Sequence, residues 1–108
     1  MRELTEFSDF QAQLDSGTPF IVWFSATWCG PCRSIDAKAV AAAATKAKVT
    51  LFHCDVDAGK RIAHVCGIRS IPTFMAFVGG EPDNKLSTAN TVAICGFIEK
   101  FGEDTAAH

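Results

Sequence analysis

The stretch FIVWFSATWCGPC, residues 20–32, places two thiols directly behind an apolar run. The run is rich in residues that favour strands, which predicts a buried β-strand over residues 20–26. The stretch that follows, Arg33 to Lys48, is rich in alanine and has no glycine or proline, which predicts a helix. Cys29 and Cys32 would then lie one helical turn apart on one face, where a disulfide can join them.

Cys29 is expected at the N-terminal end of this helix, with Pro31 in the first turn, where its missing N–H costs little. Free backbone N–H groups and the positive end of the helix dipole would face the Cys29 sulfur. A thiolate is stabilised in such a position, and the thiolate is the form of cysteine that attacks disulfides. The stretch therefore predicts a redox site.

Composition narrows the remaining possibilities. With 108 residues, 48% of them hydrophobic, the chain is expected to form one domain over residues 1–108. A net charge of -2 gives no reason to expect binding to nucleic acid or to an anionic membrane surface. The charged start MRELTE argues against a signal peptide. The protein is therefore expected in the reducing cytoplasm, where its five cysteines would not form a disulfide framework. It is also expected to be a monomer.

Hydrophobic periodicity and turn residues predict the other elements. Thr5 or Ser8 is expected to cap a first helix that runs to Leu14 and is ended by residues 15–19. In chain order there follow a strand over 49–56, a helix over 58–66 ended by Gly67, a strand over 74–78, a turn at Gly79–Gly80, a short strand at 85–87 and a helix over 91–101. This order predicts an α/β fold, with a central mixed β-sheet flanked by helices on both faces.

Residues 24–32, FSATWCGPC, resemble the active-site segment of the thioredoxin family, and Ile71-Pro72-Thr73 resembles the cis-proline loop of that family. Segments 55–57 and 67–69 also resemble family segments, so the similarity covers essentially the whole chain. Structural zinc sites use the same Cys-x-x-Cys spacing, but this sequence has no second Cys or His pair at a zinc spacing. The resemblance implies the thioredoxin fold.

The resemblance also implies a protein disulfide reductase and electron carrier. Cys29 would be the nucleophile that forms a mixed disulfide, and Cys32 would resolve it. No metal or bound cofactor is expected, because this dithiol is itself the redox centre. Gly30 and Pro31 add no charge between the cysteines, which favours a reducing dithiol over an oxidising isomerase. The implied partners are disulfide-containing proteins such as peroxidases and ribonucleotide reductase, with a reductase or a small dithiol as electron donor.

A substrate site around Cys29 follows from the same resemblance. A cis Ile71–Pro72 bond would place backbone beside the dithiol, where a substrate segment can add as a strand. The alternative is a trans proline that opens the strand at 74. The apolar patch around Cys29 is expected to comprise Trp28, Gly67, Ile71, Pro72, Thr88 and Ala89.

Trp23 and His53 are the largest departure from the family. Thioredoxins usually carry a buried aspartate behind the second cysteine, commonly paired with a lysine, at these two positions. In the family, this aspartate takes and returns the proton of the resolving cysteine. Tryptophan does not titrate, so Trp23 cannot exchange a proton with Cys32 in this way. Alternatively, Trp23 simply fills the core and removes the cost of a buried charge. His53 is a candidate substitute base or an ordinary residue of a largely buried strand.

The change at Trp23 keeps a second function open: a binding module whose dithiol reports redox state and holds a partner with little turnover. The cysteines outside the motif, Cys54, Cys66 and Cys95, are expected to be structural filler. If Cys66 were exposed, its oxidation or glutathionylation would block the patch. His64 and His108 are expected on the surface without a role.

A smaller departure is Ala37, which replaces a family proline that bends the long helix. A straighter helix is therefore expected here. Thr88 replaces a glycine beside the substrate backbone, which is expected to narrow the patch.

Overall fold

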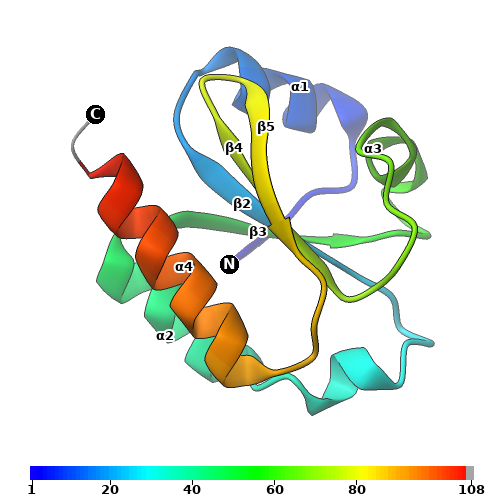
Figure 1. Ribbon diagram of the computed structural model, residues 1–108. Helices are drawn as coiled ribbons and strands as arrows, with labels where there is room; N and C mark the ends of the chain where they lie inside the picture. The colour runs from blue at the N-terminus through cyan, green and yellow to red at the C-terminus, as the bar shows by residue number, and fades with distance from the viewer. Residues whose placement is uncertain (107–108) are drawn as a thin grey trace.

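A five-stranded mixed sheet forms the centre of the protein in the computed structural model, which describes residues 1–106 (Figure 1). The strands are β1 (Arg2–Glu3), β2 (Phe20–Ser25), β3 (Thr50–Asp55), β4 (Thr73–Val78) and β5 (Glu81–Leu86). They lie in the order β1-β3-β2-β4-β5. The pairs of β3 with β1 and β2 are parallel, whereas β4 pairs antiparallel with β2 and β5. The expected mixed sheet is confirmed.

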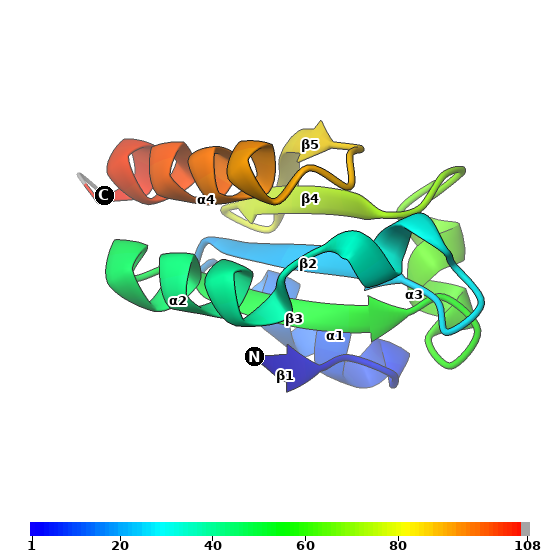
Figure 2. The same ribbon diagram turned by 90° about the horizontal axis from the view of Figure 1, so that it is seen from below.

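Helices cover both faces of this sheet (Figure 2). Helices α1 (Phe7–Asp15) and α3 (Lys60–Val65) pack on one face, and α2 (Ala37–Ala47) and α4 (Thr91–Thr105) on the other. Strand β2 is buried along its whole length, because its side chains alternate between the two cores. Phe20, Val22 and Phe24 face α1 and α3, whereas Ile21 and Trp23 face α2 and α4.

The prediction of one helix from Arg33 to Lys48 is wrong. A four-residue 3₁₀ helix, η1 (Pro31–Ser34), is separated from α2 by extended backbone at Ile35 and Asp36. Ile35 turns into the core between α2 and α4 with 7% of its surface exposed. The Asp36 carboxylate then caps α2 by accepting from the Ala39 N–H at 3.1 Å. The chain therefore turns before Ala37 without a proline there, so the expectation of a straighter helix is also wrong.

Other elements also differ from the prediction. Strand β1 was not expected; it is a two-residue edge strand whose residues are exposed. Strand β5 is longer than the predicted residues 85–87, since it starts at Glu81. It is a polar edge strand, and its Pro82 is accommodated beside an irregularity in the register with β4. Helix α4 continues past residue 101 to Thr105. Gly102 lies close to the end of α2, because a Cβ there would lie 2.8 Å from the Ala47 carbonyl oxygen.

The predicted helix end at Gly67 and the predicted turn at Gly79–Gly80 are confirmed, whereas the predicted cap of the first helix is not. Gly67 adopts φ +66° and ends α3, and Gly79 and Gly80, at φ +60° and +77°, connect β4 to β5. The residue before α1 is Glu6, without a side-chain cap bond, so the expectation of Thr5 or Ser8 as cap is wrong. Within residues 1–106, no helix has both the length and the apolar character needed to cross a membrane.

Candidate active site

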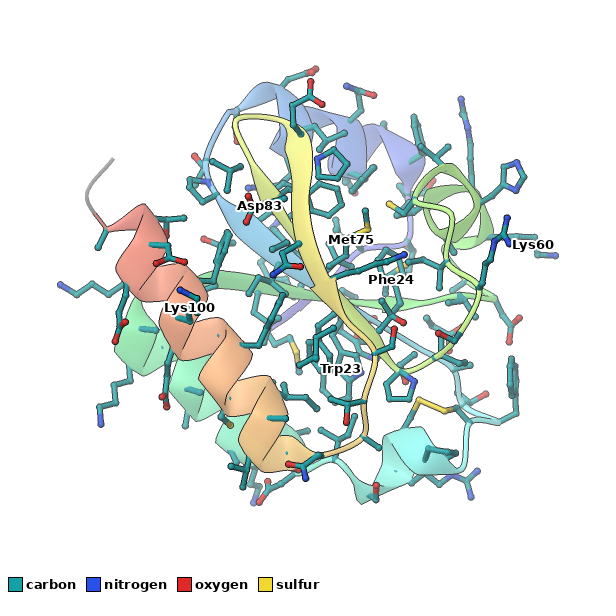
Figure 3. All side chains as sticks on the ribbon, in the orientation of Figure 1. Trp23, Phe24, Lys60, Met75, Asp83 and Lys100 are labelled. Carbon is teal, nitrogen blue, oxygen red and sulfur yellow. A yellow bond between two sulfur atoms is a disulfide. The ribbon has the colours of Figure 1, made fainter. Side chains whose placement is uncertain are left out.

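The disulfide between Cys29 and Cys32 lies just beyond the carboxyl end of β2 (yellow bond in Figure 3). The two Cα atoms are 5.4 Å apart. The Cys29 N–H donates to the Ala26 carbonyl at 3.1 Å, which turns the chain out of the strand. Gly30 precedes η1 and Pro31 is its first residue, a position where proline loses no helical hydrogen bond.

The electrostatic support for Cys29 is local. The Cys32 N–H donates to Cys29 Sγ at 3.2 Å, so one backbone donor points at this sulfur. The expected dipole of a long helix does not begin here, because α2 starts only at Ala37. A negative charge on Cys29 Sγ would therefore be stabilised by residues 29–32, called the redox segment, and chiefly by this N–H group.

Both cysteines are nearly buried, and Trp28 beside them is not. Cys29 and Cys32 expose 4% and 7% of their surface, and pack with Ala26. Trp28 is 65% exposed, and its Nε1–H donates to Asp57 Oδ2 at 2.7 Å. Sequence reasoning missed this role of Asp57. The signal was available, because parallel strands β2 and β3 end at the same edge of the sheet, shortly before these two residues.

The Ile71–Pro72 peptide bond is cis, as expected. Ile71 packs at the edge of the cluster formed by Ala26, Cys29 and Cys32, which places this loop beside the disulfide. The buried Thr73 hydroxyl donates to the Ser70 carbonyl at 2.7 Å and holds the two sides of the loop together.

An apolar groove of about 430 Å³ runs beside the disulfide. Its lining residues are Trp28, Val56, Ala63, Ile68, Arg69, Ser70 and Ile71. Two members of the predicted patch, Trp28 and Ile71, thus line one groove. Gly67 lines a smaller polar pocket on the other side of residues 68–70. Thr88 and Ala89 lie between β5 and α4, where Ala89 packs against the core under α2 and α4.

Trp23 lies in the core under α2 and α4, with 5% of its surface exposed (Figure 3). Its ring stacks on Phe74 at 5.2 Å and meets the His53 ring edge-to-face at 5.1 Å. The indole Nε1–H is buried and has no acceptor among residues 1–106. His53 Nδ1 pairs with a Glu3 carboxylate oxygen at 2.7 Å, so the polar contact of His53 points to β1.

The remaining thiols are held in their protonated form by burial. Burial raises the pKa of Cys54 from 9.0 to about 11, and that of Cys66 from 9.0 to about 12. Burial also raises the pKa of Cys95. Protonated thiols are poor nucleophiles, which agrees with a filling role for all three.

Metal ligands do not gather in the described part of the chain. No group of three or more His, Cys, Asp or Glu side chains within residues 1–106 is placed to hold a metal ion. His64 is exposed on α3, and His108 lies outside the described residues.

Comparison with known proteins identifies the family. The family model described as Thioredoxin matches residues 2–100. Putative thioredoxin-5 of Dictyostelium discoideum is 36% identical over 96 residues, which cover 87% of this chain and 91% of that protein. Thioredoxin of Oryctolagus cuniculus is 37% identical over 92 residues, covering 83% and 88%. The oxidised thioredoxin of Plasmodium falciparum has a similar structure, with a TM-score of 0.84, 30% identity and coverage of 94% and 98%.

The match extends over nearly the whole described chain and includes the redox segment and the cis-proline loop. The disulfide lies where the family's Cys-x-x-Cys motif predicts it. The chain therefore belongs to the thioredoxin family of thiol-disulfide oxidoreductases, which exchange a dithiol for a disulfide and generally need no cofactor.

Proposed function

We propose that the protein reduces disulfides of other proteins with Cys29 as the attacking thiol and Cys32 as the resolving thiol. The observation that carries this assignment is the hydrogen bond from the Cys32 N–H to Cys29 Sγ. A donor aimed at Cys29 Sγ favours its thiolate. Among residues 1–106, no N–H group donates to the Cys32 sulfur, so the two thiols are not equivalent.

The reaction runs in two exchanges. The Cys29 thiolate attacks one sulfur of the substrate disulfide, the Cys29–substrate bond forms, and the second substrate sulfur leaves as a thiolate that takes a proton from water. Cys32 then loses its proton and attacks Cys29 Sγ, which breaks the mixed disulfide. The substrate sulfur freed in this step leaves as a thiolate and takes a proton from water, so the substrate is released as a dithiol with two electrons gained, and the protein is left as the Cys29–Cys32 disulfide.

The proton of Cys32 passes to solvent in this scheme. Trp23 carries no titratable group, and the polar contact of His53 is with Glu3 on β1. Water and buffer at the edge of η1 are then the proton acceptors for the resolving step, which makes this step dependent on pH and on buffer.

The groove beside the disulfide is suited to the substrate segment that carries the disulfide. Trp28 and Ile71 offer apolar surface next to Cys29, and the bond from Trp28 Nε1 to Asp57 fixes the indole ring although it is exposed. The backbone at Ile71 lies beside the redox segment, where an extended peptide can pair with it. Trp28, Ile71 and Pro72 are therefore assigned to substrate binding.

Disulfide-containing enzymes such as peroxidases and ribonucleotide reductase are the proposed substrates, and a reductase or a small dithiol is the proposed electron donor. A similar yeast structure, 27% identical, comes from work on thiol resolving in mitochondrial 1-Cys peroxiredoxin via glutathione/thioredoxin systems. A Mycobacterium leprae relative, of which this chain covers 19%, is a bifunctional thioredoxin reductase/thioredoxin. The first supports peroxidases as substrates, and the second supports a reductase as electron donor.

We place the protein in the cytoplasm as a monomeric electron carrier in cell redox homeostasis. Support comes from the three free cysteines, Cys54, Cys66 and Cys95, because unpaired thiols are typical of reducing compartments. Light scattering after size exclusion tests the monomer directly, and a dimer at micromolar concentration would contradict it.

Reduction of insulin with dithiothreitol as donor tests the proposed activity. We expect rapid, multiple-turnover reduction by the wild type and by Cys95→Ser, a matched control that removes a thiol outside the redox segment. Cys29→Ser is expected to give only the background rate. Binding of the substrate without turnover by the wild type would contradict the reductase and favour a redox-dependent binding module.

A further inference from the structure

Residues 68–70 separate two hollows of different chemistry. On one side lies the apolar groove, and on the other a polar pocket of about 120 Å³. Ile68, Arg69 and Ser70 line both, so the two hollows share one wall. The polar pocket is further lined by Gly67, Thr73, Lys85 and Ser87, and is called the Arg69–Lys85 pocket below.

Two unpaired cations flank the Arg69–Lys85 pocket. Both side chains are exposed, and neither forms an ion pair within residues 1–106. Asp83 stands two residues before Lys85 on β5 and forms no ion pair with it. Because the chain as a whole has a net charge of -2, this pair is a local reversal of sign next to the groove.

The polar wall of the pocket is ordered by a buried hydroxyl. Thr73 exposes 3% of its surface and donates to the Ser70 carbonyl at 2.7 Å. The Ser87 hydroxyl lies 2.7 Å from the same Thr73 oxygen and donates to it. These bonds link the cis-proline loop to the segment after β5. Arg69 stands one residue before Ser70 and Lys85 two residues before Ser87, so both cations lie next to this linked pair of segments.

Arg69 is the charged residue among those that line the groove. The Asp57 carboxylate is not one of the lining residues, and it is already engaged, because it accepts from Trp28 Nε1 at 2.7 Å. A peptide in the groove therefore meets positive charge at Arg69, where guanidinium and hydroxyl groups match a carboxylate.

We propose that the Arg69–Lys85 pocket is a subsite for an aspartate or glutamate side chain of the substrate, near the cysteine that Cys29 attacks. The subsite rests on the proposed function, and it adds a substrate class: disulfides flanked by acidic residues. Arg69 is the specificity-determining residue next to the groove, and Lys85 adds charge from β5. A lysine at the same substrate position is disfavoured by like-charge repulsion.

A peptide series tests the subsite. Disulfide-linked peptides, acetylated and amidated so that a single side chain carries the sole carboxylate, have glutamate or glutamine at each of three positions on either side of the cysteine. At one position or more, we expect wild-type protein to reduce the glutamate peptide about threefold to tenfold faster at ~20 mM salt. The ratio is expected to approach one at ~500 mM salt, because salt screens exposed charges.

Variants assign the preference to the two cations. In Arg69→Gln/Lys85→Gln the glutamate-to-glutamine ratio is expected to fall to about one, and in Arg69→Glu/Lys85→Glu a lysine peptide should overtake the glutamate peptide. The matched control Lys46→Gln removes an exposed charge on α2 and should keep the wild-type ratio. Equal rates for all glutamate and glutamine peptides, or a ratio unchanged in the double variant, would overturn the subsite alone. Failure to reduce any peptide would overturn the proposed function and the subsite with it.

Discussion

Strand β2 connects two regions that differ in how they relate to the thioredoxin family. At its carboxyl end lie the redox segment and, beside it, the cis-proline loop, where the Cys29–Cys32 disulfide and the cis Ile71–Pro72 bond follow the family pattern. In its middle lies Trp23, at the position where the resemblance implies a buried aspartate. Here the ring stacks on Phe74 and contacts His53, and the layer is apolar.

In this protein, support of the attacking thiolate and packing of the core come from different residues, whereas a buried aspartate would affect both. The redox segment supplies its own donor to Cys29 through the Cys32 N–H, so the attacking thiolate does not depend on the layer behind it. The layer around Trp23 contributes packing. It carries one local cost, the unpartnered Nε1–H, on the order of 1 to 3 kcal/mol. Chemistry and stability are therefore expected to respond to different substitutions.

The largest expected effect is on turnover, at the redox segment. Cys29→Ser should reduce the rate of insulin reduction to background, because serine offers no thiolate to form the mixed disulfide. Trp23→Phe keeps an aromatic ring in the buried layer and should retain a rate close to that of the wild type. A folded Trp23→Phe protein that has lost turnover as completely as Cys29→Ser would break the comparison.

The next effect is on stability, at the buried layer. Trp23→Asp removes a large buried ring and buries a carboxyl group, so the free energy of unfolding should fall by about 3–5 kcal/mol. Trp23→Phe should cost less than about 1.5 kcal/mol, since it also removes the unpartnered donor. Urea unfolding of the oxidised proteins at pH 7 measures both. Equal losses for the two variants would show that ring packing is not what Trp23 provides.

A pH series tests how burial of a thiol outside the redox segment contributes to stability. Burial raises the pKa of Cys54 from 9.0 to about 11, so the unfolded chain loses this proton at lower pH than the folded protein. Its contribution to stability is complete below pH 9 and is lost as pH rises towards 11. The loss should be on the order of 2 to 3 kcal/mol. In the oxidised protein, urea unfolding from pH 8 to 11 should show a smaller loss for Cys54→Val; identical curves would contradict this account of Cys54.

The smallest effect is expected at the pair between His53 and Glu3. This contact between His53 Nδ1 and the Glu3 carboxylate is partly exposed, so His53→Gln should change the free energy of unfolding by less than about 1 kcal/mol. Turnover between pH 6 and 8 should follow the wild-type profile, because His53 contacts β1 and not the thiols in the described contacts. A flattened pH profile in His53→Gln would identify His53 as the base for Cys32. The layer around Trp23 and His53 would then take part in the chemistry as well as in packing.

The sequence predicts the parts of the fold that strong patterns specify. The apolar run of β2, the Gly79–Gly80 turn and Gly67 after α3 are local signals with one physical solution each. The break between η1 and α2 depends on tertiary packing, because Ile35 leaves the helix to reach the core. A local signal for the break exists in Asp36, which stands three residues before Ala39 and caps α2.

The site could be predicted where residue chemistry and family pattern agree, and not where it depends on pairing between distant elements. The disulfide and the cis bond at Pro72 fall in the first class. The bond of His53 to Glu3 falls in the second, because it joins segments 50 residues apart. For Trp28 and Asp57, which are 29 residues apart, the shared end of the parallel strands β2 and β3 indicates proximity but not the bond itself. The two-residue strand β1 has no apolar pattern of its own, so the partner of His53 was not visible in the sequence.

Trapping of mixed disulfides tests the central claim most directly, namely that Cys29 attacks and Cys32 resolves. Reduced Cys32→Ser and Cys29→Ser proteins are incubated with a disulfide peptide, quenched in acid and weighed by mass spectrometry. The account predicts a persistent adduct on Cys29 in Cys32→Ser and no adduct on Cys32 in Cys29→Ser, because only Cys29 Sγ receives a backbone N–H. A stable adduct on Cys32 in Cys29→Ser, with none on Cys29 in Cys32→Ser, would contradict it.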